Sequence, residues 1–222
     1  FKFFFYSFFA LSMTINMFIT GGRAGQVMYF VMLTILIFQF FGKEKLKSLL
    51  TVFVLVPLIF FTAYQSSNIF QSRVDQAVNN TINFEINRNS SVGERINFAI
   101  NTWDVIKENP IIGVGTGDFP SEYKKINQIN SPQMQPTTNP HNMYTLVTMQ
   151  LGFIGLMSLL SIFYFQIKLS FISQNKFFKD LGFALPIMFL VIMLSDSYLL
   201  GHYTTLVFVF FSSFLYKNFD KS

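Results

Sequence analysis

The sequence contains no cysteine, only two histidines and one tryptophan, and charged residues make up just 12% of its 222 positions. Without cysteine, neither a disulfide nor a thiolate metal site can form. Apolar residues take the place of the missing charge, because 51% of the chain is hydrophobic and 31 residues are phenylalanine, more than a soluble core of this size would use. The composition therefore indicates an integral membrane protein.

Six apolar stretches reach or approach the roughly 20 residues that a helix needs to cross the hydrocarbon layer. They lie at about residues 3–19, 27–41, 49–64, 143–165, 181–200 and 204–216. Lipid forces each stretch to satisfy its backbone hydrogen bonds internally, so each is predicted to be a helix. The predicted fold is an all-α, polytopic membrane bundle: three spans in residues 1–64, a large helix-containing loop in 65–141, and three spans in 142–222.

Charge predicts the orientation of these spans. Lysines gather at alternate ends of the stretches, as at Lys43, Lys45 and Lys47, and by the positive-inside rule those ends face the cytoplasm. The loop 65–141 holds slightly more acidic than basic residues, so it is predicted to lie on the periplasmic side of a bacterial inner membrane. The net charge of +5 follows from this distribution, and no nucleic-acid partner is expected.

The loop is predicted to contain one amphipathic helix. Residues 65–91 are rich in Asn, Ser and Gln and lack periodicity, so they are expected to be irregular. Ser91-Val-Gly-Glu94 fits a capping box, and a helix is predicted near 92–108, ending before Pro110. It is expected to lie along the membrane interface or to pack across the tops of the spans. Its apolar stripe consists of Ile96, Ala99, Ile100, Trp103 and the stem of Lys107.

Three residues are candidates for chemistry at the outer face: Arg23, Arg95 and His141. Arg23 follows two glycines at the end of the first span, where a guanidinium binds either lipid phosphate or an anionic substrate. Arg95 lies in the first turn of the predicted helix, where it is either a solvated charge or a residue that binds an anion. His141 directly precedes the 143–165 stretch, where an imidazole either accepts a proton from a sugar hydroxyl or caps the helix start.

Two further polar residues lie near the outer ends of the last spans. Asp196 falls inside the 181–200 stretch, where a carboxylate either orients a catalytic arginine or histidine or reaches water at the span's end. His202 is expected to serve in the tight turn between the last two stretches. The glycine string 113–117 is predicted to be a turn rather than a nucleotide-binding loop, because no strand precedes it.

The ordered set of motifs resembles the family of O-antigen ligases and Wzy-type O-antigen polymerases. These motifs are Gly-Gly-Arg23-Ala, Gly93-Glu-Arg95 with Trp103, the Asn109–Gly117 segment, Pro140-His141-Asn142 and Gln150-Leu-Gly-Phe-Ile-Gly155. Members of that family have more spans, and this chain starts with Phe1, so it is expected to be the C-terminal half of a longer protein.

The resemblance implies a glycosyltransferase that takes a glycan from undecaprenyl pyrophosphate and joins it to an acceptor hydroxyl, without a metal or other cofactor. Arg23 and Arg95 would bind the pyrophosphate, and His141 would activate the acceptor. The implied acceptor is the lipid A core of lipopolysaccharide; a polymerase would use a second lipid-linked glycan, and a protein O-oligosaccharyltransferase would use serine or threonine. The mechanism requires the two guanidinium groups and the imidazole to meet at one phosphate-sized pocket.

A lipid-linked glycan flippase or transporter is the alternative from another class. Its charged groups would line a path through the bilayer. In this sequence Asp196 is the one acidic residue inside a predicted span, so the pattern favours chemistry at the surface.

Overall fold

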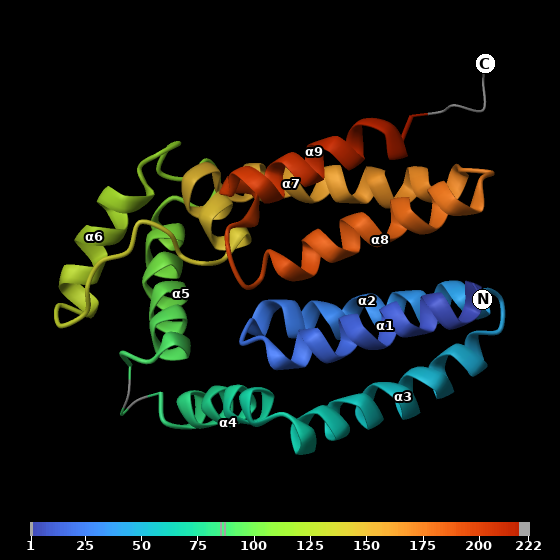
Figure 1. The fold of residues 1–222 in the computed structure, drawn as a ribbon. Coiled ribbons are helices and arrows are strands. Elements are labelled where there is room, and N and C mark those ends of the chain that lie inside the picture. Colours follow the sequence, from blue (N-terminus) through green and yellow to red (C-terminus); the bar gives the residue numbers. More distant parts are fainter. Residues whose placement is uncertain (1, 85, 87, 218–222) are drawn as a thin grey trace. The chain divides into compact units, whose positions relative to one another are not determined.

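The computed structural model describes residues 2–84, 86 and 88–217. These residues form nine α-helices and one short 3-10 helix, and none of them lies in a strand. The all-helical prediction is therefore confirmed for the described part of the chain. The backbone packs as two compact units, Phe1–Ile82 and Asn83–Ser222 (Figure 1).

The first unit is a set of apolar helices that fold back on one another. It comprises α1 (Lys2–Ile19), α2 (Arg23–Phe41), α3 (Lys45–Ser66) and α4 (Asn68–Ile82). Its core is small and aromatic: the buried rings of Phe18 and Phe70 meet edge to face, with centroids 5.0 Å apart. The Ser67 hydroxyl, at the bend between α3 and α4, donates to the Phe18 carbonyl at 2.7 Å. This bend holds the start of α4 against the end of α1.

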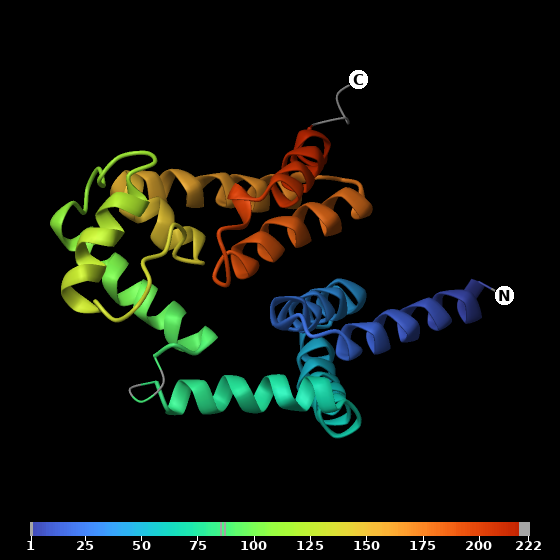
Figure 2. The same ribbon diagram turned by 60° about the vertical axis from the view of Figure 1, so that its left-hand side comes forward.

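The second unit combines three apolar helices with two polar ones. It comprises α5 (Ser91–Glu108), α6 (Phe119–Asn130), α7 (Met143–Ile172), α8 (Lys176–Ile192), the 3-10 helix Tyr198–Leu200 and α9 (His202–Leu215). Helices α7 and α8 pack along each other, and α9 packs against α8. Helices α5 and α6 contact each other and also α7, and both views show them gathered at one end of it (Figures 1 and 2).

Each of the six predicted stretches forms a helix, but only three helices in the described residues are long and apolar enough to cross a membrane. These are α2, α3 and α7, while α1 and α9 are shorter apolar helices. Helix α8 begins with charged residues and ends at Ile192, so the prediction of a span over 181–200 is wrong at its outer end. The structure supports a helical membrane protein with three candidate spans, and the count of six remains a prediction.

The segment between the apolar groups is more ordered than the sequence suggests. Residues 65–91 are expected to be irregular, yet Asn68–Ile82 forms α4. Phe70 and Val74 lie one helical turn apart and pack on the core of the first unit, so a short apolar stripe suffices once a partner is present. The sequence does not predict helix α6 either. Its buried Phe119 and Tyr123 are likewise spaced by four residues.

Helix α5 covers the residues for which a helix is predicted, but it packs through a different face. Phe98, Val105 and Ile106 are buried, whereas Ile100 and Trp103 on the predicted stripe are 49% and 51% exposed. The expectation that this stripe packs across other helices is therefore wrong within the second unit. Its location at the membrane interface remains a prediction.

Candidate active site

His141 lies in a tight turn immediately before α7, in a backbone conformation that residues other than glycine rarely adopt. Its φ is +52°, in the left-handed region. The turn is held by Asn139, whose side-chain oxygen accepts from the His141 backbone N–H at 2.9 Å. The helix start itself is capped by Asn142, whose Oδ1 accepts from the N–H groups of Tyr144 and Thr145. The His141 ring is therefore not needed as a cap.

Asp196 contacts the imidazole directly. Its Oδ1 lies 3.2 Å from His141 Nδ1, and each side chain is 38% exposed. The same oxygen accepts from the Ser197 backbone N–H at 2.7 Å and from Asn139 Nδ2 at 3.3 Å. A carboxylate can only accept, so Nδ1 carries the proton and Nε2 is left as the proton acceptor. The structure shows Asp196 in contact with a histidine, as one of its two alternatives requires, and its carboxylate also reaches solvent, as the other does.

The prediction of a span over 181–200 places Asp196 inside a helix, and the structure shows that this is wrong. Helix α8 ends at Ile192, and the chain turns through 193–197 before the 3-10 helix begins. Two hydrogen bonds tie this turn to the start of α7: Met143 N donates to Met193 O at 3.0 Å, and Asn142 Nδ2 donates to Leu194 O at 3.2 Å. Imidazole and carboxylate are thus fixed by backbone groups on both sides, which keeps their spacing constant.

The other face of the imidazole is covered by an aromatic ring. Phe98 of α5 stacks on His141 with ring centroids 6.0 Å apart and an interplanar angle of 26°. Arg95 precedes Phe98 by three residues, so both lie on the same side of α5, and Arg95 is exposed. The packing of Phe98 thus joins the helix that carries Arg95 to the turn that carries His141.

Helix α5 is itself positioned by a buried network of amides. Asn101 is fully buried and donates from Nδ2 to the Tyr123 hydroxyl and to Asn127 Oδ1, both at 3.3 Å. The Asn127 side chain donates in turn to the Met134 carbonyl at 2.8 Å. Burial raises the pKa of Tyr123, so its hydroxyl stays neutral and available for these bonds. A satisfied polar network of this kind fixes one arrangement of α5 on α6.

Helix α7 is broken close to the histidine turn. Gly152 has φ +64° and ψ −167°, and the backbone of 110–115 fills the break. Phe153 N donates to Pro110 O at 2.8 Å, and Val114 N donates to Met149 O at 2.9 Å. A Cβ on Gly152 would lie 2.1 Å from the Ile111 oxygen, so only glycine fits. Non-helical backbone inside a membrane helix requires partners of this kind.

The glycine string 113–117 completes the same contact. Gly113 has φ +71°, and a Cβ there would lie 2.4 Å from the Gln150 carbonyl carbon. Gly115 N donates to Gln150 O at 2.9 Å. The string is a turn, but its glycines also allow two backbones to touch. The predicted span over 143–165 is accordingly two helical segments joined at Gly152.

Arg23 belongs to the first unit, whereas Arg95 and His141 belong to the second. It begins α2, directly after Gly22, and its Nη2 donates to Gln76 Oε1 of α4 at 3.1 Å. His202, the other histidine, is exposed at the start of α9. Within the described residues, no group of three or more His, Cys, Asp or Glu side chains could hold a metal ion.

Several contributors are not identifiable from the sequence. Asn139 stands out only as part of the motif before His141, although an Asn-Pro pair is a signal for a turn. Phe98 gives no signal, because a phenylalanine on an amphipathic helix is usually core. The link between Asp196 and His141 spans 55 positions, which local patterns do not reveal.

The second unit thus defines a class: a helical membrane protein with a histidine–carboxylate pair at the start of a broken apolar helix. The O-antigen ligase family profile matches residues 8–160, which include Arg23, Arg95 and His141. The chain belongs to that family, as the ordered motifs predict. No curated protein matches it. Family membership assigns glycosyl transfer of the ligase or polymerase type, with a lipid-linked glycan and an acceptor as substrates.

Proposed function

We propose that the protein transfers a glycan from undecaprenyl pyrophosphate to an acceptor hydroxyl at the periplasmic face of the bacterial inner membrane. The observation that carries the proposal is the His141–Asp196 pair, at 3.2 Å with both side chains partly exposed. A half-exposed imidazole with its Nδ1 proton held by a carboxylate can receive a proton at Nε2. A ligase or polymerase needs such a group to activate its acceptor.

In the proposed reaction the acceptor oxygen attacks the anomeric carbon of the donor glycan, and its proton passes to Nε2 of His141. The bond between that carbon and the pyrophosphate oxygen breaks, and its electron pair stays on the pyrophosphate. Arg23 and Arg95 bind the phosphate oxygens through charge-assisted hydrogen bonds and stabilise the growing negative charge. Because two guanidinium groups supply this charge, we propose a metal-independent reaction. Asp196 acts as a positioning residue that stabilises the imidazolium.

The proposal is tested in proteoliposomes that contain the full-length protein, a lipid-linked glycan and a candidate acceptor. Replacing His141 or Arg95 by alanine is expected to lower transfer by about 100-fold or more. The matched controls, His202→Ala and Arg88→Ala, remove the same chemical groups elsewhere in the second unit and should leave transfer unchanged. Retained transfer in both His141→Ala and Arg95→Ala would exclude the mechanism.

The mass of the product decides the acceptor. Addition to a lipid A core defines a ligase, addition to a second lipid-linked glycan defines a polymerase, and addition to a serine or threonine defines a protein O-oligosaccharyltransferase. Transport that depends on a proton gradient, without a new glycosidic bond, would instead identify a flippase.

The proposed topology has six spans, in residues 1–64 and 142–222, with residues 65–141 in the periplasm. The absence of cysteine makes a direct test available. Gln128→Cys in α6 should react with a membrane-impermeant maleimide in cells with a permeabilised outer membrane. Gln174→Cys, between α7 and α8, should react only after the inner membrane is opened. The opposite pattern would overturn the orientation.

A further inference from the structure

Two arginines meet at one polar end of the first unit. Arg23 of α2 donates from Nη2 to Gln76 Oε1 at 3.1 Å, and Arg73 of α4 donates from Nη1 to the same oxygen at 3.5 Å. Both guanidinium groups thus lie within hydrogen-bond reach of one amide oxygen. An anion with several oxygens could accept from both of them.

The Arg73 guanidinium lies next to Gly21, which has no side chain. A Cβ on Gly21 would lie 3.2 Å from Arg73 Nη2, so a larger residue would displace the guanidinium. Gly22, which follows, provides no side-chain cap for α2. Arg73 is exposed and forms no ion pair with any residue that the structure describes. The guanidinium is therefore positioned but accessible.

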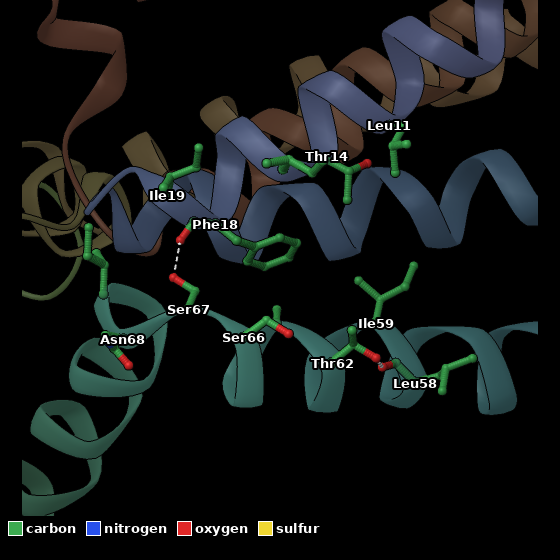
Figure 3. A pocket seen from close by; sticks show the side chains of 13 residues that line it. Leu11, Thr14, Phe18, Ile19, Leu58, Ile59, Thr62, Ser66, Ser67 and Asn68 are labelled. Carbon is green, nitrogen blue, oxygen red and sulfur yellow. Dashed lines mark hydrogen bonds between the residues drawn. The ribbon is translucent and has the colours of Figure 1, made fainter.

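The first unit also contains an apolar groove. It has a volume of about 730 Å³ and runs between α1 and α3, the latter one of the candidate spans (Figure 3). Leu11, Ile15 and Leu58 are among the residues that line it. Its end toward the bend at Ser67 is lined by Ile19 and Ile69.

Residues at one end of the groove lie close in sequence to the residues around the two arginines. Ile19 lies two residues before Gly21, where an added Cβ would meet the Arg73 guanidinium. Ile69 lies four residues before Arg73 on α4, so both occupy one side of that helix. An amphiphile with an apolar chain in the groove would therefore carry its headgroup to the two guanidinium groups.

We infer that Arg73 joins Arg23 in binding the pyrophosphate of the donor lipid, and that the α1–α3 groove of the first unit holds its isoprenoid chain. This inference rests on the proposed function for the identity of the donor. A pyrophosphate suits the site better than the single phosphodiester of an ordinary phospholipid, because it offers separate oxygens to each guanidinium. Arg73 is thereby assigned as a further substrate-binding residue.

The test is equilibrium binding to the full-length protein in nanodiscs, without an acceptor, using polyprenyl pyrophosphate and inorganic pyrophosphate as probes. Arg73→Gln is expected to raise the Kd for both probes by about tenfold. Arg73→Lys keeps the charge but loses the planar fork, so its effect should be smaller. Arg88→Gln is the matched control and should leave both Kd values unchanged.

The groove is tested separately. Thr62 lines it, so Thr62→Trp should fill it and weaken polyprenyl pyrophosphate binding without affecting inorganic pyrophosphate. Val54→Trp adds the same ring at a 63% exposed position of α3 outside the groove and should have no effect. Equal effects of the two tryptophans, or competition by phosphatidylglycerol at the same concentration as the polyprenyl probe, would overturn the assignment of the groove.

The binding assay also separates this inference from the proposed function. Unchanged binding in Arg73→Gln, with normal transfer by the wild type, would overturn the role of Arg73 and leave the transferase proposal standing. Arg73-dependent binding by a protein that forms no glycosidic bond would overturn the transferase proposal and leave the role of Arg73 standing.

Discussion

The polar ends of the two units are built in different ways. In the second unit, Asp196 Oδ1 accepts three hydrogen bonds, including one from the backbone of Ser197 and one involving the His141 ring. In the first unit, Arg23 and Arg73 are long side chains that share a single amide oxygen. One end is fixed by the backbone around it, and the other is set by side-chain contacts between α2 and α4.

This difference corresponds to what each end is proposed to do. Proton transfer requires heavy-atom distances held within a few tenths of an ångström, so a base is best mounted on a rigid turn. Binding of a pyrophosphate tolerates movement, because flexible guanidinium groups follow the anion and form their hydrogen bonds as it arrives. We therefore expect the histidine turn to be sensitive to backbone changes, and the Arg23–Arg73 pair to depend mainly on its charge.

The largest expected effect comes from breaking the backbone contact in the second unit. Gly152→Ala places a Cβ 2.1 Å from the Ile111 oxygen and forces a residue other than glycine to φ +64°. Because the contact is between two backbones, neither side can move away. We expect a loss on the order of 4 kcal/mol or more, measured as the disappearance of folded protein from the membrane fraction and a lower melting temperature in detergent.

Gly117→Ala is the matched control for this prediction. Gly117 also has a positive φ, +88°, but a Cβ there meets nothing within 4 Å. Its substitution should cost about 1 kcal/mol from backbone strain alone. If Gly152→Ala were no worse than Gly117→Ala, the backbone contact would not be what holds α7 in its broken form.

The next largest effect is expected at the carboxylate that contacts the His141 ring. Asp196→Asn keeps an oxygen that can accept from the Ser197 N–H, but it removes the charge that holds Nδ1–H and stabilises the imidazolium. We expect kcat for transfer to fall by about 10- to 100-fold, while the Kd for polyprenyl pyrophosphate stays the same. Asp180→Asn, which removes a partly exposed carboxylate paired with Lys176, is the control. A change in donor affinity equal to the change in kcat would contradict a positioning role.

The sequence predicts the parts of this molecule that depend on composition and local pattern. The apolar stretches form helices, and the helix near 92–108 is expected from a capping signal. The N-cap is Ser90, whose side chain accepts from Gly93 N, so the predicted cap at Ser91 is wrong by one residue. Helix α4 is missed because its apolar stripe is short and gains its stability from packing against Phe18. The face of α5 is misassigned because buried asparagines, such as Asn101, occupy the side that hydropathy assigns to solvent.

The candidate site divides in the same manner. His141 and Arg95 are identifiable as residue types at informative places, and the family motifs identify them again. The Asp196 contact and the Phe98 stacking could not be predicted, because they join positions that are distant in sequence through packing. Gly113 and Gly152 are visible in the sequence as glycines in turns or motifs. That Gly113 is required by the backbone of 150–152, and Gly152 by the backbone of Ile111 and Ile112, becomes visible only in three dimensions.

A smaller effect is expected in the amide network that holds α5 on α6. Asn101→Ala removes the donor to Tyr123 and Asn127 and leaves both groups buried without that partner. The expected cost is about 2 kcal/mol, seen as faster hydrogen exchange in α6. Transfer activity should fall less than in Asp196→Asn. Unchanged exchange in α6 would mean that the network does not position α5.

The smallest effect is expected at the exposed edge of the same interface. Asp104 accepts from Asn130 Nδ2 at 2.8 Å and pairs with Lys107 at 2.7 Å, and the hydrogen bond from Lys107 lowers the pKa of the Asp104 carboxyl. Because the pKa is lowered in the folded protein, the ionised pair stabilises the fold at pH values above the usual pKa of the carboxyl. This contribution is lost as the pH falls through the lowered pKa. Asp104→Asn should therefore cost only ~0.5 kcal/mol at pH 7, and the difference from the wild type should shrink below about pH 4. Melting curves at pH 7 and about pH 3.5 measure this difference in stability. A cost at pH 7 as large as that of Asn101→Ala would show that the exposed pair, rather than the buried amides, holds the two helices together.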